Sequence, residues 1–171
     1  EKKRPPAPPA LIGKMALGPI KFITRDSKRI KYRDWFTDPS DMKSLLTWTQ
    51  DKLDIHYRSV EAEFAHFSYD PRELPALLLT GHDAFELEDT TRAKLNRYVL
   101  DGGMLIGDAC CGWQDFDAAF RREMAAIFPD QPLRKLALDD PIFASYYKLD
   151  QFVYQQEDGS KSFDKPCLEG I

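Results

Sequence analysis

The stretch "RYVLDGGMLIGDACCGWQDFDAAF", residues 97–120, contains the end of one helix, a buried strand, a turn and the start of a second helix. Gly102 and Gly103 close the first helix, because glycine readily adopts the left-handed backbone that often ends helices. Residues 104–107 are apolar without alternation, which is typical of a parallel strand covered on both faces. A helix is expected over residues 114–128, stopped by Pro129, with one apolar face made of Phe116, Phe120, Met124 and Ile127.

A second stretch of this kind lies upstream. In "ELPALLLTGHDAF", residues 73–85, positions 76–79 are continuously apolar and predict another buried strand. A helix over residues 89–101 separates the two strands, with Glu88 and Asp89 at its positive end. A helix between two such strands favours a parallel crossover. Residues 77–80 and 105–108 are therefore predicted to be adjacent parallel strands.

The remaining segments extend the pattern. Residues 20–32 read as a strand or a hairpin, and residues 55–64 as a further strand. Between them, Asp38 is the expected N-cap of a helix that reaches residue 53, with Pro39 at the first helical position. The fold class is therefore α/β, with a mostly parallel sheet and helices on both faces.

The two ends of the chain are less regular. Four prolines among the first nine residues predict a Pro-rich linker over residues 1–12, which leaves residues 13–171 as a single α/β domain. Near the other end, residues 139–156 are expected to hold a short helix and a strand, and residues 157–166 a loop.

Composition excludes several classes of protein. The chain has 171 residues, a net charge of -4 and three cysteines. This balance argues against general nucleic-acid binding, and no apolar run approaches the length of a membrane helix. Three cysteines are too few for a disulfide scaffold. Six basic residues lie in or directly after the predicted hairpin and are expected to form a solvated face, with an anion-binding patch as the alternative: Lys21, Arg25, Lys28, Arg29, Lys31 and Arg33.

Polar groups follow both buried strands. Ligands of open α/β sheets bind outside the carboxyl ends of the strands, so the residues after the two strands are expected to face one crevice. We take as crevice candidates Thr80, Gly81, His82, Asp108, Cys110, Cys111, Gly112, Trp113 and Gln114. Trp113 is expected to pack in the core, with a crevice wall as the alternative.

Four interpretations of this segment are open. Cys110 is a candidate nucleophile, with His82 as its base and the following helix favouring a thiolate. His82, Asp108 and Cys110, with Cys111 adjoining, are candidate zinc ligands, although adjacent cysteines rarely face one ion. Cys110 or Cys111 with Cys167 is a candidate redox pair. The fourth interpretation is a purely structural turn with a buried thiol, in which Asp108 accepts hydrogen bonds from backbone amides.

Four segments together resemble the bacterial domain-of-unknown-function family 4159: "RDWFTDP", "LPALLLTGHDAFEL", "RYVLDGGMLIGDACCGWQDFDAAFRREMAAIFPD" and "DDPIF". The resemblance covers residues 15–150. It implies a three-layer, flavodoxin-like fold similar to the class I glutamine amidotransferases, in bacterial envelope proteins or larger multidomain chains, without an established activity. The resemblance also implies a further strand after residue 171, so the domain is expected to lack its natural C-terminal end.

The spacing Cys110-x-Gly112-x-Gln114 resembles the nucleophile turn of those amidotransferases. Asp108 stands where they carry glycine, and no histidine follows His82. Asp139-Asp140-Pro141 also replaces the Asp-His-Pro that is frequent in the family.

On balance the sequence favours a non-catalytic binding or interaction module, with a cysteine-dependent hydrolase or amidotransferase-like enzyme as the alternative. Expected partners are other domains of a parent chain or envelope proteins, without nucleic acid or direct membrane insertion. The family resemblance favours an extracytoplasmic location. The sequence identifies no cofactor and no oligomeric state.

Overall fold

The computed structural model describes residues 10–36, 38–155 and 158–171, and the chain divides into two compact units, residues 1–127 and 128–171. The first unit contains a four-stranded parallel sheet and three α-helices, so the α/β class predicted from the sequence is confirmed. Among the described residues, no helix combines the length and the apolar character needed to cross a membrane.

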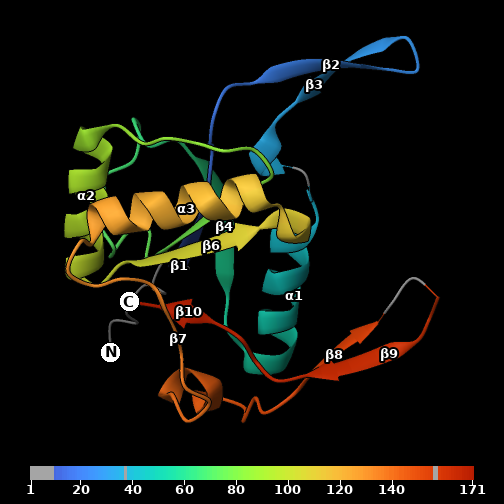
Figure 1. Ribbon diagram of the computed structural model, residues 1–171, viewed down its shortest axis with the longest axis vertical. Coiled ribbons are helices and arrows are strands. Elements are labelled where there is room, and N and C mark those ends of the chain that lie inside the picture. Colours follow the sequence, from blue (N-terminus) through green and yellow to red (C-terminus); the bar gives the residue numbers. More distant parts are fainter. Residues whose placement is uncertain (1–9, 37, 156–157) are drawn as a thin grey trace, which may run out of the picture. The chain divides into compact units, whose positions relative to one another are not determined.

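The sheet of the first unit has the strand order β4-β1-β5-β6, and each neighbouring pair is parallel (Figure 1). Its strands are β1 (Ala10–Met15), β4 (Tyr57–Ala62), β5 (Ala76–Gly81) and β6 (Met104–Ala109). The predicted adjacency of β5 and β6 is confirmed, since Leu77 lies opposite Leu105 and Thr80 opposite Asp108. Their carboxyl ends therefore meet at one edge of the sheet. The predicted burial of β6 on both faces is wrong: it is the outermost strand of the sheet, and Met104 and Ile106 are 54% and 41% exposed.

Strand β1 begins inside the segment interpreted as a linker. Residues 10–12 of that segment are strand, and residues 1–9 lie outside the described residues. The strand pairs with β4 on one side and with β5 on the other, so it occupies the middle of the sheet.

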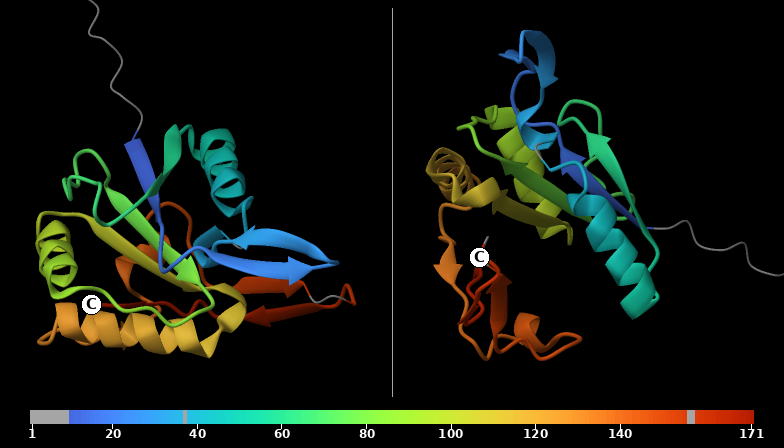
Figure 2. Two further views of the ribbon diagram at one scale, coloured as in Figure 1. Left: turned by 90° about the horizontal axis from the view of Figure 1, so that it is seen from above. Right: turned by 90° about the vertical axis from the view of Figure 1, so that its right-hand side faces the viewer.

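The helices lie on opposite faces of this sheet. They are α1 (Asp41–Leu53), α2 (Asp89–Leu100) and α3 (Gln114–Ile127). Lys14 and Ile106 share one face through the register, and the buried Lys14 ammonium pairs with Asp41 at the start of α1. Gly107 faces the other side, where a Cβ would come within 2.4 Å of the Phe120 ring on α3. Figure 2 shows α1 across the sheet from α2 and α3.

The core lies between the sheet and the pair α2 and α3. Leu77 and Leu79 of β5 are fully buried, as are Tyr98 of α2 and, with 1% exposure, Phe116 of α3. The Tyr98 hydroxyl donates to the Leu74 carbonyl at 2.7 Å. Glu123 on α3 is also fully buried, and its carboxylate accepts hydrogen bonds from the Arg92 guanidinium on α2 at 2.8 and 3.2 Å.

Two details of the helices differ from the sequence-based predictions. The N-cap of α1 is Ser40 and not Asp38, so Pro39 lies before the helix and not at its first position. The Asp38 carboxylate accepts from the Ser40 amide at 3.1 Å and forms the turn before the helix. Within α3, Phe116, Met124 and Ile127 are buried as predicted, but Phe120 is only half-buried. It lies over the edge strand β6 and not over the centre of the sheet.

Residues 20–32 form the hairpin that the sequence offered as one of two possibilities. Strands β2 (Lys21–Arg25) and β3 (Lys28–Tyr32) are antiparallel and joined by Asp26 and Ser27, both with positive φ. The hairpin extends away from the sheet (Figure 1), and side chains on both of its faces are exposed, including Phe22 and Ile30. The Arg29 guanidinium lies over the Phe22 ring at 4.3 Å. The 3₁₀ helix η1 (Asp34–Phe36) follows directly.

The second unit consists of short elements. It contains β7 (Arg134–Lys135) paired with β10 (Glu169–Gly170), the 3₁₀ helix η3 (Pro141–Ala144), and the hairpin of β8 (Phe152–Gln155) and β9 (Lys161–Asp164). The predicted helix and strand over residues 139–156 are confirmed. The loop predicted for residues 157–166 is wrong at β9, where backbone pairing with β8 forms a strand whose side chains are all exposed. The Asp140 carboxylate accepts from the Ile142 amide at 3.0 Å, so Asp140 caps η3.

Candidate functional site

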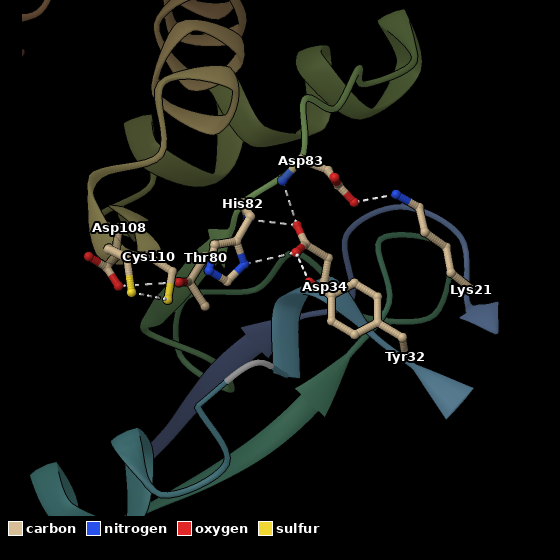
Figure 3. A network of polar contacts seen from close by, with 9 residues as sticks. Lys21, Tyr32, Asp34, Thr80, His82, Asp83, Asp108 and Cys110 are labelled. Carbon is tan, nitrogen blue, oxygen red and sulfur yellow. Dashed lines mark hydrogen bonds and ion pairs between the residues drawn. The ribbon is translucent and has the colours of Figure 1, made fainter. Parts of the chain in front are cut away.

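The candidate site lies at the carboxyl ends of β5 and β6. Gly81 and Ala109 are register partners at the ends of these strands. His82 follows Gly81 directly, and Cys110 follows Ala109. A ring nitrogen of His82 and the sulfur atoms of Cys110 and Cys111 all lie within 4.8 Å of one another. Figure 3 shows the His82 ring between Asp34 on one side and Cys110 on the other.

The two cysteines occupy a tight turn before α3. The 3₁₀ turn η2 (Cys110–Gly112) has Cys111 at φ 56° and Gly112 at φ 73°, and the Trp113 amide donates to the Cys110 carbonyl at 3.2 Å. The two sulfur atoms are 3.7 Å apart. Cys110 is half-buried and Cys111 is exposed, so the expectation of a buried thiol is wrong, although the expectation of a turn holds.

Asp34 holds His82 in place. One of its carboxylate oxygens, Oδ1, lies 3.1 Å from Nδ1 of the His82 ring and accepts from the Tyr32 hydroxyl at 2.8 Å. The other oxygen, Oδ2, accepts from the backbone amides of His82 and Asp83, both at 2.8 Å. Both partners are well covered, with 10% of the Asp34 side chain and 21% of the His82 side chain exposed. This carboxylate is therefore fully engaged, and it fixes both the backbone and the ring of His82.

Local backbone explains how Asp34 reaches the end of β5. It is the first residue of η1, which turns the chain from the hairpin back over the sheet. Gly81 leaves room for it, because a Cβ at that position would lie 2.5 Å from Oδ2 of Asp34. Glycine is required here by close approach and not by its backbone angles.

The hydrogen bonds determine the charge state of this pair. Burial raises the pKa of Asp34, but the amides of Asp83 and His82 and the Tyr32 hydroxyl outweigh burial and hold this pKa below its ordinary value. Burial, and then the hydrogen bond to Asp34, raise the pKa of Tyr32 to about 12. At neutral pH the site therefore contains an Asp34 carboxylate and a Tyr32 hydroxyl that donates to it.

Further groups surround the site. Lys21 on β2 pairs with Asp83, and this hydrogen bond raises the pKa of the Lys21 ammonium. The Trp113 and His82 rings meet edge to face with centroids 5.5 Å apart. The Trp113 side chain is 53% exposed, so its predicted packing in the core is wrong, and it forms a wall beside His82. Trp113 lies between the turn after β6 and the first residue of α3, and its side chain points outward at this junction.

The other crevice candidates lie as follows. The Thr80 hydroxyl donates to the Asp108 carboxylate at 3.2 Å, so a side chain satisfies Asp108 in place of the expected backbone amides. Asp108 does not belong to the group of possible ligand atoms that joins His82 with the two cysteines in the described part of the chain. Gln114 is exposed as the first residue of α3. Cys167 is exposed in the second unit, and its pairing with Cys110 or Cys111 stays a prediction.

Sequence reasoning missed Asp34 and Tyr32. Both precede Trp35 in "KYRDWF", where the resemblance through "RDWFTDP" assigns Asp34 no role and a single acid after a basic hairpin indicates no chemistry. Their partner His82 is 48 residues away from Asp34 along the chain, so only the tertiary fold unites them.

The arrangement provides the parts of a nucleophilic site. A carboxylate on Nδ1 of a histidine places the ring proton on that nitrogen, which leaves Nε2 as the basic atom. A thiol close to such a base can transfer its proton to it and become a thiolate, the form that attacks electrophiles.

Comparison with known proteins identifies a family. Residues 27–166 match the family model described as domain of unknown function (DUF4159). The match covers most of the chain, which therefore belongs to this family, and it includes Asp34, His82, Cys110 and Cys111. No curated protein matches the chain.

Proposed function

We propose that this member of the DUF4159 family is a thiol-dependent hydrolase of amide or ester bonds. Cys110 is the nucleophile, His82 is the general base and acid, and Asp34 positions His82. The observation that carries the proposal is the His82 ring held between the Asp34 carboxylate and the Cys110 thiol. The absence of a histidine after His82 argued against catalysis, but Asp34 supports His82 as a base.

The chemistry follows a two-step path. The Cys110 thiol gives its proton to Nε2 of His82 and its sulfur attacks the substrate carbonyl carbon. The bond from that carbon to the leaving nitrogen or oxygen breaks, and the leaving group takes the proton from His82. Water then attacks the thioester, gives a proton to His82 and releases the carboxylic acid, and that proton returns to the sulfur. Trp113 borders the site and offers an apolar surface to the acyl group.

The fold supports this proposal. The strand order β4-β1-β5-β6, with α1 on one face and α2 and α3 on the other, is consistent with a three-layer, flavodoxin-like arrangement. Such sheets bind ligands at the carboxyl ends of their strands. The turn Cys110-x-Gly112-x-Gln114 also agrees with a class I glutamine amidotransferase-like origin, but the histidine comes from the neighbouring strand β5.

The test is hydrolysis of a small activated ester, p-nitrophenyl acetate, by the reduced chain in the presence of a chelator. Cys110→Ser is expected to abolish the reaction, and His82→Ala to slow it by about 10²–10⁴-fold. Cys167→Ser, which removes the thiol of the second unit, is the matched control and should hydrolyse the ester as the wild type does. Equal rates for the wild type and Cys110→Ser contradict the proposal.

A binding role is the second candidate function, and the exposed hairpin of β2 and β3 favours it. This hairpin presents Phe22, Ile23 and Ile30 to solvent among five basic side chains, of which Lys21 pairs with Asp83, and this suits an acidic protein surface with apolar patches. We propose another domain of a parent chain, or a protein of the bacterial envelope, as the owner of that surface, and an extracytoplasmic location. Poly-glutamate is a simple probe: binding that salt and Lys28→Glu/Lys31→Glu weaken supports this role, whereas equal binding by the variant contradicts it.

A further inference from the structure

Cys111 has no part in the proposed hydrolysis, yet its sulfur lies beside that of Cys110. Adjacent cysteines usually diverge, but the positive φ of Cys111 occurs in a turn where the two sulfur atoms are 3.7 Å apart. Two thiolates bound at about 2.3 Å to a tetrahedral zinc ion are about 3.8 Å apart. The pair therefore already has the spacing of two ligands on one ion.

His82 completes a set of three ligands. One of its ring nitrogens lies within 4.8 Å of both sulfur atoms, a range that includes the roughly 3.6 Å between nitrogen and sulfur ligands of one tetrahedral zinc ion. Its Nδ1 is engaged by Asp34, so Nε2 is the nitrogen available to a metal. A carboxylate behind the histidine is the usual support of a metal ligand, because it fixes the tautomer and raises the basicity of the ring.

We infer that Cys110, Cys111 and His82 bind a soft divalent cation, with Zn²⁺ as the expected ion. Two sulfur ligands and one nitrogen ligand select zinc over magnesium or calcium, which prefer oxygen. Binding releases the two thiol protons. Three protein ligands leave the fourth position of the ion to water or to an added molecule.

This inference goes beyond the proposed hydrolysis, because a metal ion bound at these residues would inhibit that reaction. A sulfur atom bound to zinc cannot attack a carbonyl carbon, and a metal on Nε2 removes the base. Zn²⁺ is therefore expected to inhibit ester hydrolysis and to protect Cys110 from alkylation. Asp34 acts here as a positioning residue, since it contacts the ligand and not the ion.

The test is titration of the metal-free chain, kept reduced with a phosphine, with Co²⁺ as a spectroscopic substitute and then with Zn²⁺. A near-ultraviolet charge-transfer band from thiolate to cobalt is expected, which one equivalent of Zn²⁺ removes. Cys111→Ser is expected to weaken Zn²⁺ binding by more than about 100-fold, and Asp34→Asn by about 10–100-fold. Cys167→Ser is the matched control and should bind Zn²⁺ with wild-type affinity.

The outcomes separate this inference from the proposed function. Absence of the cobalt band in the wild type, or equal Zn²⁺ affinity of Cys111→Ser and the wild type, overturns the metal site whatever the esterase shows. If the wild type shows the cobalt band but does not hydrolyse the ester in the presence of the chelator, the metal site is supported and only the proposed hydrolase activity is contradicted. Far-ultraviolet circular dichroism shows whether each variant is folded, and protection of Cys110 from iodoacetamide by Zn²⁺ tests the same ligand in the unmodified chain.

Discussion

Oδ2 of Asp34 lies 2.5 Å from the position that a Cβ would occupy on Gly81, so the carboxylate fills the space that this glycine leaves at the end of β5. The same oxygen accepts the amides of His82 and Asp83. Any side chain at position 81 therefore competes directly with the group that holds His82.

We expect Gly81→Ala to lower the free energy of unfolding by about 1–3 kcal/mol, because a methyl group is forced into an occupied space. Ester hydrolysis should fall with it, since Asp34 must move. Denaturant titration measures the first effect. In an Asp34→Ala background the same substitution should cost much less, and equal costs in both backgrounds would show that another contact is responsible.

Asp34→Asn is expected to destabilise the chain by about 1–3 kcal/mol, because an amide group must then face hydrogen-bond donors that the carboxylate accepted. Asp83→Asn is the control: it removes only the exposed pair with Lys21 and should cost less than about 1 kcal/mol. Thermal and denaturant unfolding compare the two. Similar losses would mean that Asp34 is not a structural anchor.

Glu123 and Arg92 join α3 to α2 through a carboxylate that is fully buried. Glu123→Gln should lower the free energy of unfolding by about 1.5–3 kcal/mol, the range for a lost hydrogen bond to a charged group. On the same helix, Asp117→Asn breaks the exposed pair with Arg121 and should change stability by less than about 0.5 kcal/mol. A Glu123→Gln variant as stable as Asp117→Asn would contradict the role of the buried pair.

Phe116 and Phe120 lie on one helix but differ in burial. Phe116→Ala should cost about 3–5 kcal/mol because it leaves a cavity in the core. Phe120→Ala should cost clearly less, since that ring is partly exposed over Gly107. Chemical denaturation of the two variants shows which of them loses more free energy of unfolding. A larger loss for Phe120→Ala would mean that the helix is rotated about its axis.

Asp70 provides a prediction for acid pH. The Arg72 side chain, followed by its backbone amide, lowers the pKa of Asp70 to about 2. Since this value lies below that of an unfolded aspartate, about 3.9, the carboxylate stabilises the fold above pH 4, and the contribution disappears as the pH falls towards 2. In Arg72→Ala the pKa of Asp70, followed by NMR, should rise towards 4. An unchanged value would contradict the pairing.

Much of the first unit could be predicted from local sequence. Continuous apolar runs identified β5 and β6, and the helix between them fixed their parallel pairing, which brings His82 and Cys110 to one edge. Strand β1 was missed because prolines precede it and Gly13 and Lys14 interrupt its apolar pattern. The partners that make Lys14 acceptable in a strand are Asp41 at the start of α1 and the Asp38 carbonyl in the turn before that helix.

The candidate site shows the same limit. The ends of strands can be located from the hydrophobic pattern of the sequence. A site residue that a 3₁₀ turn places there, such as Asp34 in η1, cannot be located in this way. Asp34 reaches His82 through the hairpin and through the space at Gly81, and neither leaves a local signal. The convergence of the two cysteine sulfurs likewise depends on the backbone angles of one turn.

The central position of β1 has a practical consequence for handling the protein. In a parallel sheet the amino ends of all strands lie on one side and their carboxyl ends on the opposite side. Ala10, at the amino end of β1, is therefore a strand length away from His82 and Cys110, which follow the carboxyl ends of β5 and β6. An affinity tag or reporter fused ahead of Ala10 is thus kept a full strand length from the thiols. A deletion that extends past Met15, in contrast, removes the only strand bonded to β4 among the described residues, and would leave two additional unpaired strand edges, on β4 and β5, that are prone to aggregation.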